Sequence, residues 1–156
     1  MLLKKIYENM NKILFSLAFV LIAFGSIQAA EYIKARPSQS IGVRGILKCN
    51  GRPASGVLVK LYDHDTFTLD DKIASGRTDS MGQFEISGTA HEISRITPKF
   101  NIYHDCDDWL PCQRKISINI PKGYITRGEN ANSIYDVGTM ELAGQFAGES
   151  RDCLHK

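Results

Sequence analysis

The residues best able to do chemistry are concentrated in one segment, Pro98–Arg114, which reads PKFNIYHDCDDWLPCQR. It holds two of the four cysteines, the only tryptophan, one of the four histidines and three acidic residues. Such a mixture could ligate a metal, catalyse a reaction, recognise a partner or close a disulfide loop.

A zinc site in this segment would use His104, Cys106 and Cys112, because zinc binds imidazole nitrogen and thiolate sulfur. Their spacing matches no common structural zinc site. Disulfide bonding of the cysteines is the competing interpretation, and it depends on the compartment in which the chain resides.

The first thirty residues predict export. Lys4, Lys5 and Lys12 form a positive start, the apolar run 13–24 follows, and Ala29 and Ala30 offer a cleavage point. We therefore assign 1–30 as a signal peptide, with translation starting at Met1 or at Met10. The apolar run is shorter than the roughly 20 residues that span a bilayer, so no transmembrane anchor is expected.

Removal of residues 1–30 takes away three basic and one acidic residue and leaves 16 of each, a formal net charge of zero. Nucleic-acid binding proteins carry a basic surplus, so we expect no nucleic-acid partner. Strong general attraction to anionic membranes is not expected either. The predicted compartment is extracellular, and the protein is expected to be secreted.

From residue 41 onward, apolar and polar residues alternate in short runs separated by turn residues, which is typical of β-strands. A single helical turn is expected over 89–96, because Thr89 and Glu92 have capping-box spacing. The pattern predicts an all-β sandwich of about eight strands in two sheets with at most one short helical turn. The expected strands are 41–49, 56–62, 72–78, 83–87, 99–104, 115–120, 124–127 and 136–142.

The organisation expected after the signal is a flexible leader at 31–40, one sandwich domain at 41–145 and a C-terminal tail at 146–156. All four cysteines, Cys49, Cys106, Cys112 and Cys153, follow the signal, and an even number in an exported domain favours disulfides. Three pairings are possible. Cys106 and Cys112 are the expected short-loop pair, which leaves Cys153 to tie the tail to Cys49.

The runs CNGRPASGVLVKLYDHD, TDSMGQFEISG, PKFNIYHDC, INIPKGYI and YDVGTMEL occur in that order. The chain resembles, in these runs, the transthyretin-like family of secreted nematode proteins. The resemblance implies a transthyretin-type (prealbumin-like) sandwich of two four-stranded sheets and an extracellular protein without assigned catalysis.

Two relatives of that fold have known activities. Hydroxyisourate hydrolases, which resemble the Cys49–Ala54 region, use a His–Arg–His set and a C-terminal Tyr-Arg-Gly-Ser tail. This sequence ends in RDCLHK and lacks that tail. Transthyretin itself carries thyroid hormone in a tetramer channel, but a cysteine-containing loop replaces its helix here. The expectation is therefore a protein that is not an enzyme, with no catalytic residues and no cofactor.

The best binding candidate is Trp109, because aromatic residues anchor interfaces and a disulfide loop would hold this one in place. Inward packing against the core is the alternative. Further binding candidates are Tyr103, Asp105, Asp107 and Asp108. Weak calcium candidates, chosen as oxygen ligands crowded into one loop, are Asp63, Asp65, Asp70 and Asp71.

The function predicted from the sequence is that of a secreted, non-enzymatic binding protein that recognises an extracellular protein or cell-surface partner. The alternative is an extracellular carrier of a small hydrophobic ligand or lipid, which requires an apolar cavity. A hydrolase of the hydroxyisourate type would require a concave site with convergent histidine, arginine and acid.

Overall fold

The structure is a computed structural model of the chain, and it describes residues 10–22, 24, 36–64 and 69–154. The chain divides into two units, Met1–Arg36 and Pro37–Lys156. In the first unit, residues 10–22 are helical. No helix within the described ranges is long and apolar enough to cross a membrane. Much of the predicted signal peptide and leader lies outside the described residues, so both stay predictions.

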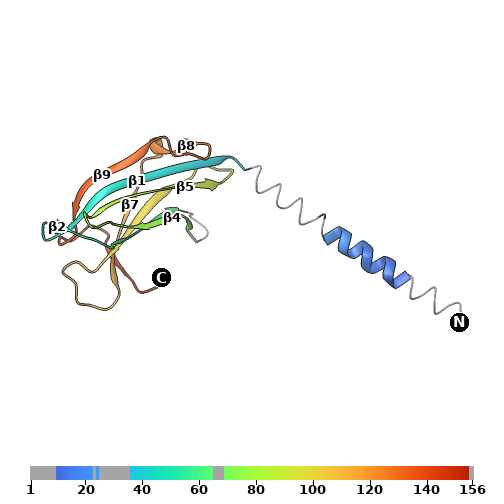
Figure 1. Cartoon of the computed structure of the whole chain (residues 1–156), viewed down its shortest axis with the longest axis horizontal. Coiled ribbons are helices and arrows are strands. Elements are labelled where there is room, and N and C mark those ends of the chain that lie inside the picture. The colour runs from blue at the N-terminus through green and yellow to red at the C-terminus, as the bar shows by residue number, and fades with distance from the viewer. Residues whose placement is uncertain (1–9, 23, 25–35, 65–68, 155–156) are drawn as a thin grey trace. The chain divides into compact units, whose positions relative to one another are not determined.

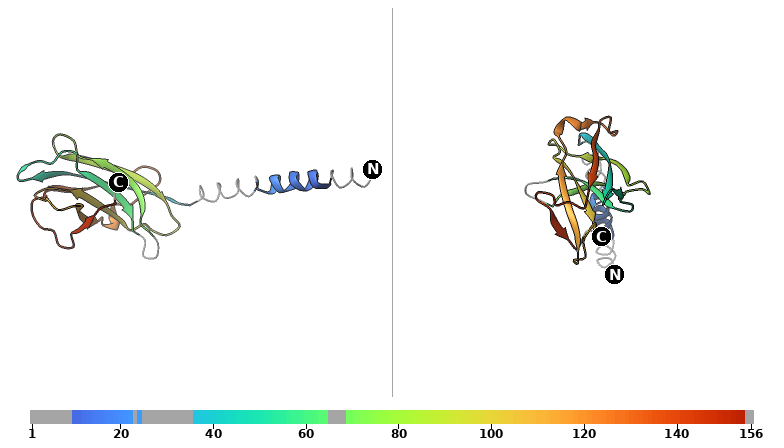
Figure 2. Two further views of the ribbon diagram at one scale, coloured as in Figure 1. Left: turned by 90° about the horizontal axis from the view of Figure 1, so that it is seen from below. Right: turned by 90° about the vertical axis from the view of Figure 1, so that its left-hand side faces the viewer.

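Within the described residues of the second unit, every regular element except one 3-10 helix is a strand, which confirms the predicted all-β class (Figure 1). Viewed from two further directions, the strands form two layers packed face to face (Figure 2). The elements, in order, are β1 (Ser38–Cys49), β2 (Arg52–Pro53), β3 (Leu58–Asp63), β4 (Asp71–Arg77), β5 (Gln83–His91), β6 (Pro98–His104), β7 (Gln113–Asn119), the 3-10 helix η1 (Lys122–Tyr124), β8 (Thr126–Arg127), β9 (Ile134–Glu141) and β10 (Ser150–Asp152).

The first sheet is organised around β1, which pairs with every other strand of that sheet. β5 and β2 run antiparallel to it along one edge. Along the other edge lie β8, antiparallel, and β9, parallel. β9 approaches β1 closely, because a Cβ added at Gly42 would lie 2.3 Å from the Cδ1 atom of Ile134.

The second sheet has the order β10-β7-β6-β3-β4, with all neighbours antiparallel. Its inner face packs on the first sheet through alternate residues, as the period of two predicted. Each fully buried aliphatic or aromatic side chain contributes about 1.5–3 kcal/mol. Those without any exposed surface are Ile41, Val43, Leu47, Val59, Leu61, Phe100, Ile102 and Leu142.

One local prediction is wrong: residues 89–96 form no helical turn. β5 instead continues to His91 because β1 begins at Ser38 and pairs with it there. The hydroxyl of Thr89 lies 2.8 Å from that of Ser40 and donates to the carbonyl of Glu129, so it caps no helix. The 3-10 helix lies later, at Lys122–Tyr124, where a strand from residue 124 was expected.

Strand pairing extends beyond both ends of the sandwich domain that the sequence predicted at 41–145. The leader supplies the first residues of β1, and the tail supplies β10. β1 therefore runs from one end of the domain to the other. We call the end at Cys49 the loop end and the end at Ser38 the far end; β2 and β8 mark them in Figure 1.

Candidate binding site at the loop end

The loop 105–112 joins β6 to β7 and is anchored by both disulfides of the described chain. Cys106 bonds to Cys49, with the two Cα atoms 5.7 Å apart. Cys112 bonds to Cys153, with a Cα separation of 4.4 Å. Disulfide bonding is thus confirmed, but the expected pairs Cys106–Cys112 and Cys49–Cys153 are wrong.

The register of the sheets explains this pairing. β10 pairs with β7 through Asp152 and Gln113, so the next residues outward, Cys153 and Cys112, come opposite each other. Cys106 is only 8% exposed and faces the core, where β1 ends at Cys49. One disulfide therefore joins the two sheets, and the other closes the loop onto the tail.

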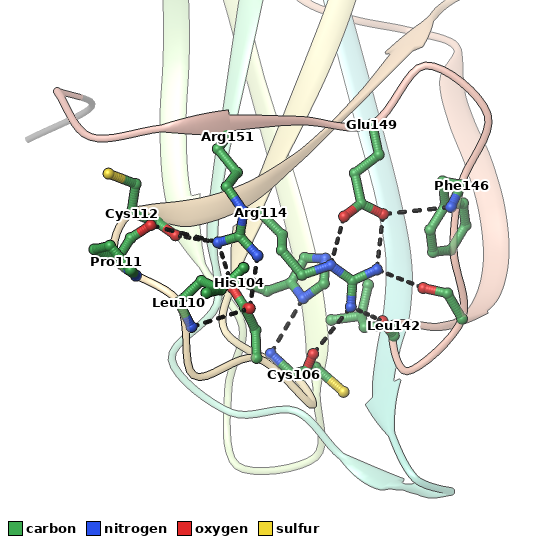
Figure 3. A network of polar contacts seen from close by, with 12 residues as sticks. His104, Cys106, Leu110, Pro111, Cys112, Arg114, Leu142, Phe146, Glu149 and Arg151 are labelled. Atoms are coloured by element: carbon green, nitrogen blue, oxygen red, sulfur yellow. Dashed lines mark hydrogen bonds and ion pairs between the residues drawn. The ribbon is translucent and has the colours of Figure 1, made fainter.

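Arg114, on the inner face of β7, connects three segments of the loop end through its guanidinium (Figure 3). Its Nε and Nη2 atoms donate to the two carboxylate oxygens of Glu149, at 2.5 and 2.7 Å. Nη1 donates to the carbonyls of Cys106 and Leu142, and Nη2 also donates to the carbonyl of Gly144. One guanidinium thus bridges the loop, the end of β9 and the tail.

Arg151 on β10 holds the loop from the tail side (Figure 3). Nη2 and Nη1 donate to the two oxygens of Asp108 at 2.6 and 2.7 Å, a bidentate geometry. Nη1 also donates to the carbonyl of Cys112. The hydrogen bonds from Arg151 hold the pKa of Asp108 below its usual range.

His104 is buried beneath this network and is 2% exposed. Its Nδ1 atom accepts a hydrogen bond from the backbone N–H of Cys106, so the ring proton lies on Nε2, which has no hydrogen-bond partner among the described residues. Burial, and secondarily the nearby Arg114 charge, lowers the pKa of His104. The ring is therefore neutral near pH 7.

The predicted alternative, a zinc site formed by His104, Cys106 and Cys112, is wrong. Cys106 and Cys112 are both in disulfides, and a disulfide sulfur is not a thiolate ligand. The close group formed by Cys49, Cys106 and Asp107 has the same two bonded sulfurs.

Trp109 points into solvent at the tip of the loop, with 89% of its surface exposed. Leu110 beside it is 45% exposed. The alternative of inward packing is thereby excluded. Tyr103 is only 3% exposed and lies beneath the ammonium of Lys60, 5.5 Å from the ring centre, so it adds no accessible surface.

The three loop aspartates have distinct protein partners. Asp105 accepts a hydrogen bond from the side-chain amide of Gln113, at 2.6 Å. Asp107, at a φ of 50°, accepts one from Asn50 at 2.7 Å. With Asp108 held by Arg151, the acids position the loop.

The weak calcium candidates are not brought together with this loop. β3 pairs Asp63 with Pro98, the first residue of β6, whereas the loop follows the last residue of that strand. Asp63 is buried and accepts from the backbone N–H of Thr97. Asp70 lies 2.5 Å from the ammonium of Lys99 and also contacts His64. Asp71 is exposed, and Asp65 lies outside the described residues.

The sequence interpretation missed Arg114, Glu149 and Arg151 as a group. One signal was present: Arg114 has the same parity as Ile116, Ile118 and Ile120 and so occupies the core side of the strand. No comparable pattern marks the tail residues.

Both guanidiniums in the depression of ≈ 460 Å³ between loop and tail already bind carboxylates, so this depression is no anion site.

Comparisons with known proteins agree with this architecture. The profile described as "Transthyretin-like family" matches residues 44–121. Transthyretin-like protein 5 of Caenorhabditis elegans is 54% identical over 86% of this chain and 99% of its own length. Transthyretin-like proteins 33 and 2 of that organism are 48% and 42% identical, over 88% and 86% of this chain and 93% and 95% of their own lengths. The chain therefore belongs to the transthyretin-like family.

Proposed function

We propose that this protein acts outside the cell as a binding protein and recognises a protein or cell-surface partner through the loop tip formed by Trp109 and Leu110. The observation that carries the proposal is an almost fully exposed tryptophan on a loop anchored at both ends by disulfides. Tryptophan is among the residues most enriched at interface hot spots.

The rigidity of the loop supports a binding role. Two disulfides and the bidentate Asp108–Arg151 pair hold the backbone on both sides of Trp109. A partner that engages the tip therefore orders few additional groups, and this reduces the entropy cost of binding. Fixing an apolar ring in water stabilises no fold, so a binding role accounts for this arrangement better than a structural one.

Secretion is part of the proposal. Two disulfides are typical of proteins from oxidising compartments, and the N-terminal sequence has the pattern of a signal peptide. A non-enzymatic role is favoured because the loop-end histidine is buried and neutral, and both loop-end arginines are saturated by carboxylates. Carriage of a ligand between the sheets is disfavoured by the packed side chains there.

The test is affinity capture of extracellular partners on immobilised protein. Trp109→Ala should reduce capture at least about tenfold, the loss expected for a hot-spot aromatic. Leu69→Ala is the matched control, because Leu69 is 90% exposed but precedes β4 and lies away from the loop. Equal recovery by Trp109→Ala and the parent protein, or equal losses in both variants, would refute the assignment of the tip.

The only tryptophan gives this test an internal readout. Its fluorescence should resemble that of tryptophan in water and shift to shorter wavelength when a captured partner covers it. Arg151→Gln should lower its anisotropy, since the bidentate contact to Asp108 is lost. Binding without any change in tryptophan emission would place the interface elsewhere.

A further inference from the structure

A second candidate site lies at the far end of β1, away from the loop. A pocket of ≈ 490 Å³ opens there, within the usual range of about 300–1,000 Å³ for small-molecule sites. Its apolar wall is formed by Pro37, Ile93 and Ile125. Ile93 is 71% exposed although it is a large aliphatic residue.

The pocket walls are fixed by β1. Gln39, 7% exposed, donates to the carbonyls of Glu92 and Ser94 and accepts from the backbone N–H of Ile96. These bonds hold one wall on the strand. The opposite wall, β8, pairs with residues 39 and 40 of the same strand. The pocket is thus formed before any ligand arrives.

Two arginines also line the pocket. Arg95 donates one hydrogen bond, to the carbonyl of Lys122, and no ion pair involves it in the described part of the chain. Over the same ranges, the guanidinium of Arg127 has neither a hydrogen bond nor an ion pair. No carboxylate is among the lining residues. The contrast is with Arg114 and Arg151, whose charges are matched by carboxylates.

From this arrangement we infer that the far-end pocket binds a small amphipathic carboxylate. Its apolar body would lie against Pro37, Ile93 and Ile125, and its carboxylate would accept hydrogen bonds from Arg127 and Arg95. Guanidinium groups recognise carboxylates by paired, charge-assisted hydrogen bonds, and burial of a hydrocarbon chain against the apolar wall stabilises the complex. The twelve residues of β1 separate this pocket from the loop tip by roughly 35 Å, so the inference does not depend on the proposed function.

The probe for the test is octanoate, with 1-octanol as a matched uncharged ligand. In a ¹H–¹⁵N NMR titration of the disulfide-bonded protein, octanoate should shift residues 92–96 and 125–127 saturably. Octanol should bind at least about tenfold more weakly, because it makes no charge-assisted bond. Equal affinity for the two probes, shifts confined to the loop 105–112, or no saturable shift would overturn the assignment.

Variants separate the two halves of the pocket. Arg127→Gln should weaken octanoate binding about tenfold and leave octanol binding unchanged. Ile93→Asp places a negative charge on the exposed apolar wall and should abolish octanoate binding. Arg44→Gln is the control, since Arg44 already pairs with Asp136 away from the pocket, and should bind octanoate as the parent does. An unchanged affinity in Arg127→Gln refutes the role of its guanidinium.

Discussion

Replacing Arg114 with methionine should destabilise the domain far more than replacing any surface arginine. The change keeps much of the side-chain volume but removes the donors to Glu149 and to three backbone carbonyls. The side chains of Arg114 and Glu149 are only 9% and 18% exposed. The carboxylate would therefore lose its counter-charge while still shielded from water.

The size of the effect follows from burial. Removing one partner of a buried ion pair costs about 3–5 kcal/mol. Because this pair retains some exposure, we expect the lower end, about 3 kcal/mol. The carbonyl of Leu142, a fully buried residue, also loses its donor, and an unsatisfied buried group costs about 1–3 kcal/mol. The two costs overlap, so they are not summed.

The assay is urea unfolding at pH 7 with the disulfides intact, followed by far-ultraviolet circular dichroism. Arg44→Met is the matched control, because the Arg44–Asp136 pair is 53% and 51% exposed and should contribute no more than about 1 kcal/mol. The double variant Arg114→Met/Glu149→Met should recover part of the loss, since no unpaired charge is left. If Arg114→Met costs no more than Arg44→Met, the inferred role of the guanidinium is wrong.

The same pair predicts a dependence on pH. The hydrogen bonds from Arg114 lower the pKa of Glu149 in the folded protein. A carboxyl with a lowered folded pKa stabilises above its unfolded value, about 4.3, and loses that contribution as the pH falls further. Acid destabilisation below pH 4.3 should therefore be shallower in Arg114→Met than in the parent. An identical loss of stability below pH 4.3 in Arg114→Met and in the parent would contradict this account.

Three more predictions concern other parts of the domain. Burial lowers the pKa of His104, so stability should fall as the pH drops below about 6.5, by at most about 1.4 kcal/mol per unit, and His104→Asn should flatten this slope in urea titrations. Gly82→Ala should lower the free energy of unfolding by well over the roughly 1–2 kcal/mol expected for Gly56→Ala. Both positions have positive φ, but only at Gly82 would the new Cβ lie 2.3 Å from a backbone carbonyl oxygen. Similar losses in melting temperature for the two variants would contradict this. Replacing Cys112 and Cys153 with serine should lower the free energy of unfolding by about 4 kcal/mol, because the disulfide closes a 41-residue loop. In the parent protein, peptide mapping after cleavage at the loop tip should recover the Cys49–Cys106 and Cys112–Cys153 disulfides.

The sequence was sufficient to predict the class of the fold. The strands that alternation predicted at 83–87 and 99–104 are present, and their alternate apolar residues Phe84, Ile86, Phe100 and Ile102 are all buried. These predictions depend on the alternation of apolar and polar residues along each strand, which is a local property and does not depend on how the strands are arranged. The family resemblance, carried by ordered motifs, is confirmed by the family profile that matches residues 44–121.

Local patterns failed where a distant segment competed. The capping-box spacing at Thr89 predicted a helical turn, but pairing with the start of β1 satisfied the same backbone groups in a strand. Short spacing predicted a Cys106–Cys112 disulfide, but Cys106 bonds to Cys49 at the end of β1 and Cys112 bonds to Cys153 just after β10. Spacing measures distance along the chain, and a disulfide depends on distance in space.

For the segment Pro98–Arg114, the predicted export, the even number of cysteines and the family resemblance together indicated a disulfide-bonded loop that carries the only tryptophan. Tertiary structure decided that Trp109 faces solvent, that Arg114 and Arg151 lock the loop to the tail, and that Arg95 and Arg127, which form no ion pair within the described residues, line a pocket with an apolar wall at the opposite end. The physical reason is that strand propensity and cysteine parity are encoded locally, whereas burial and charge pairing arise only when strands far apart in sequence come into register.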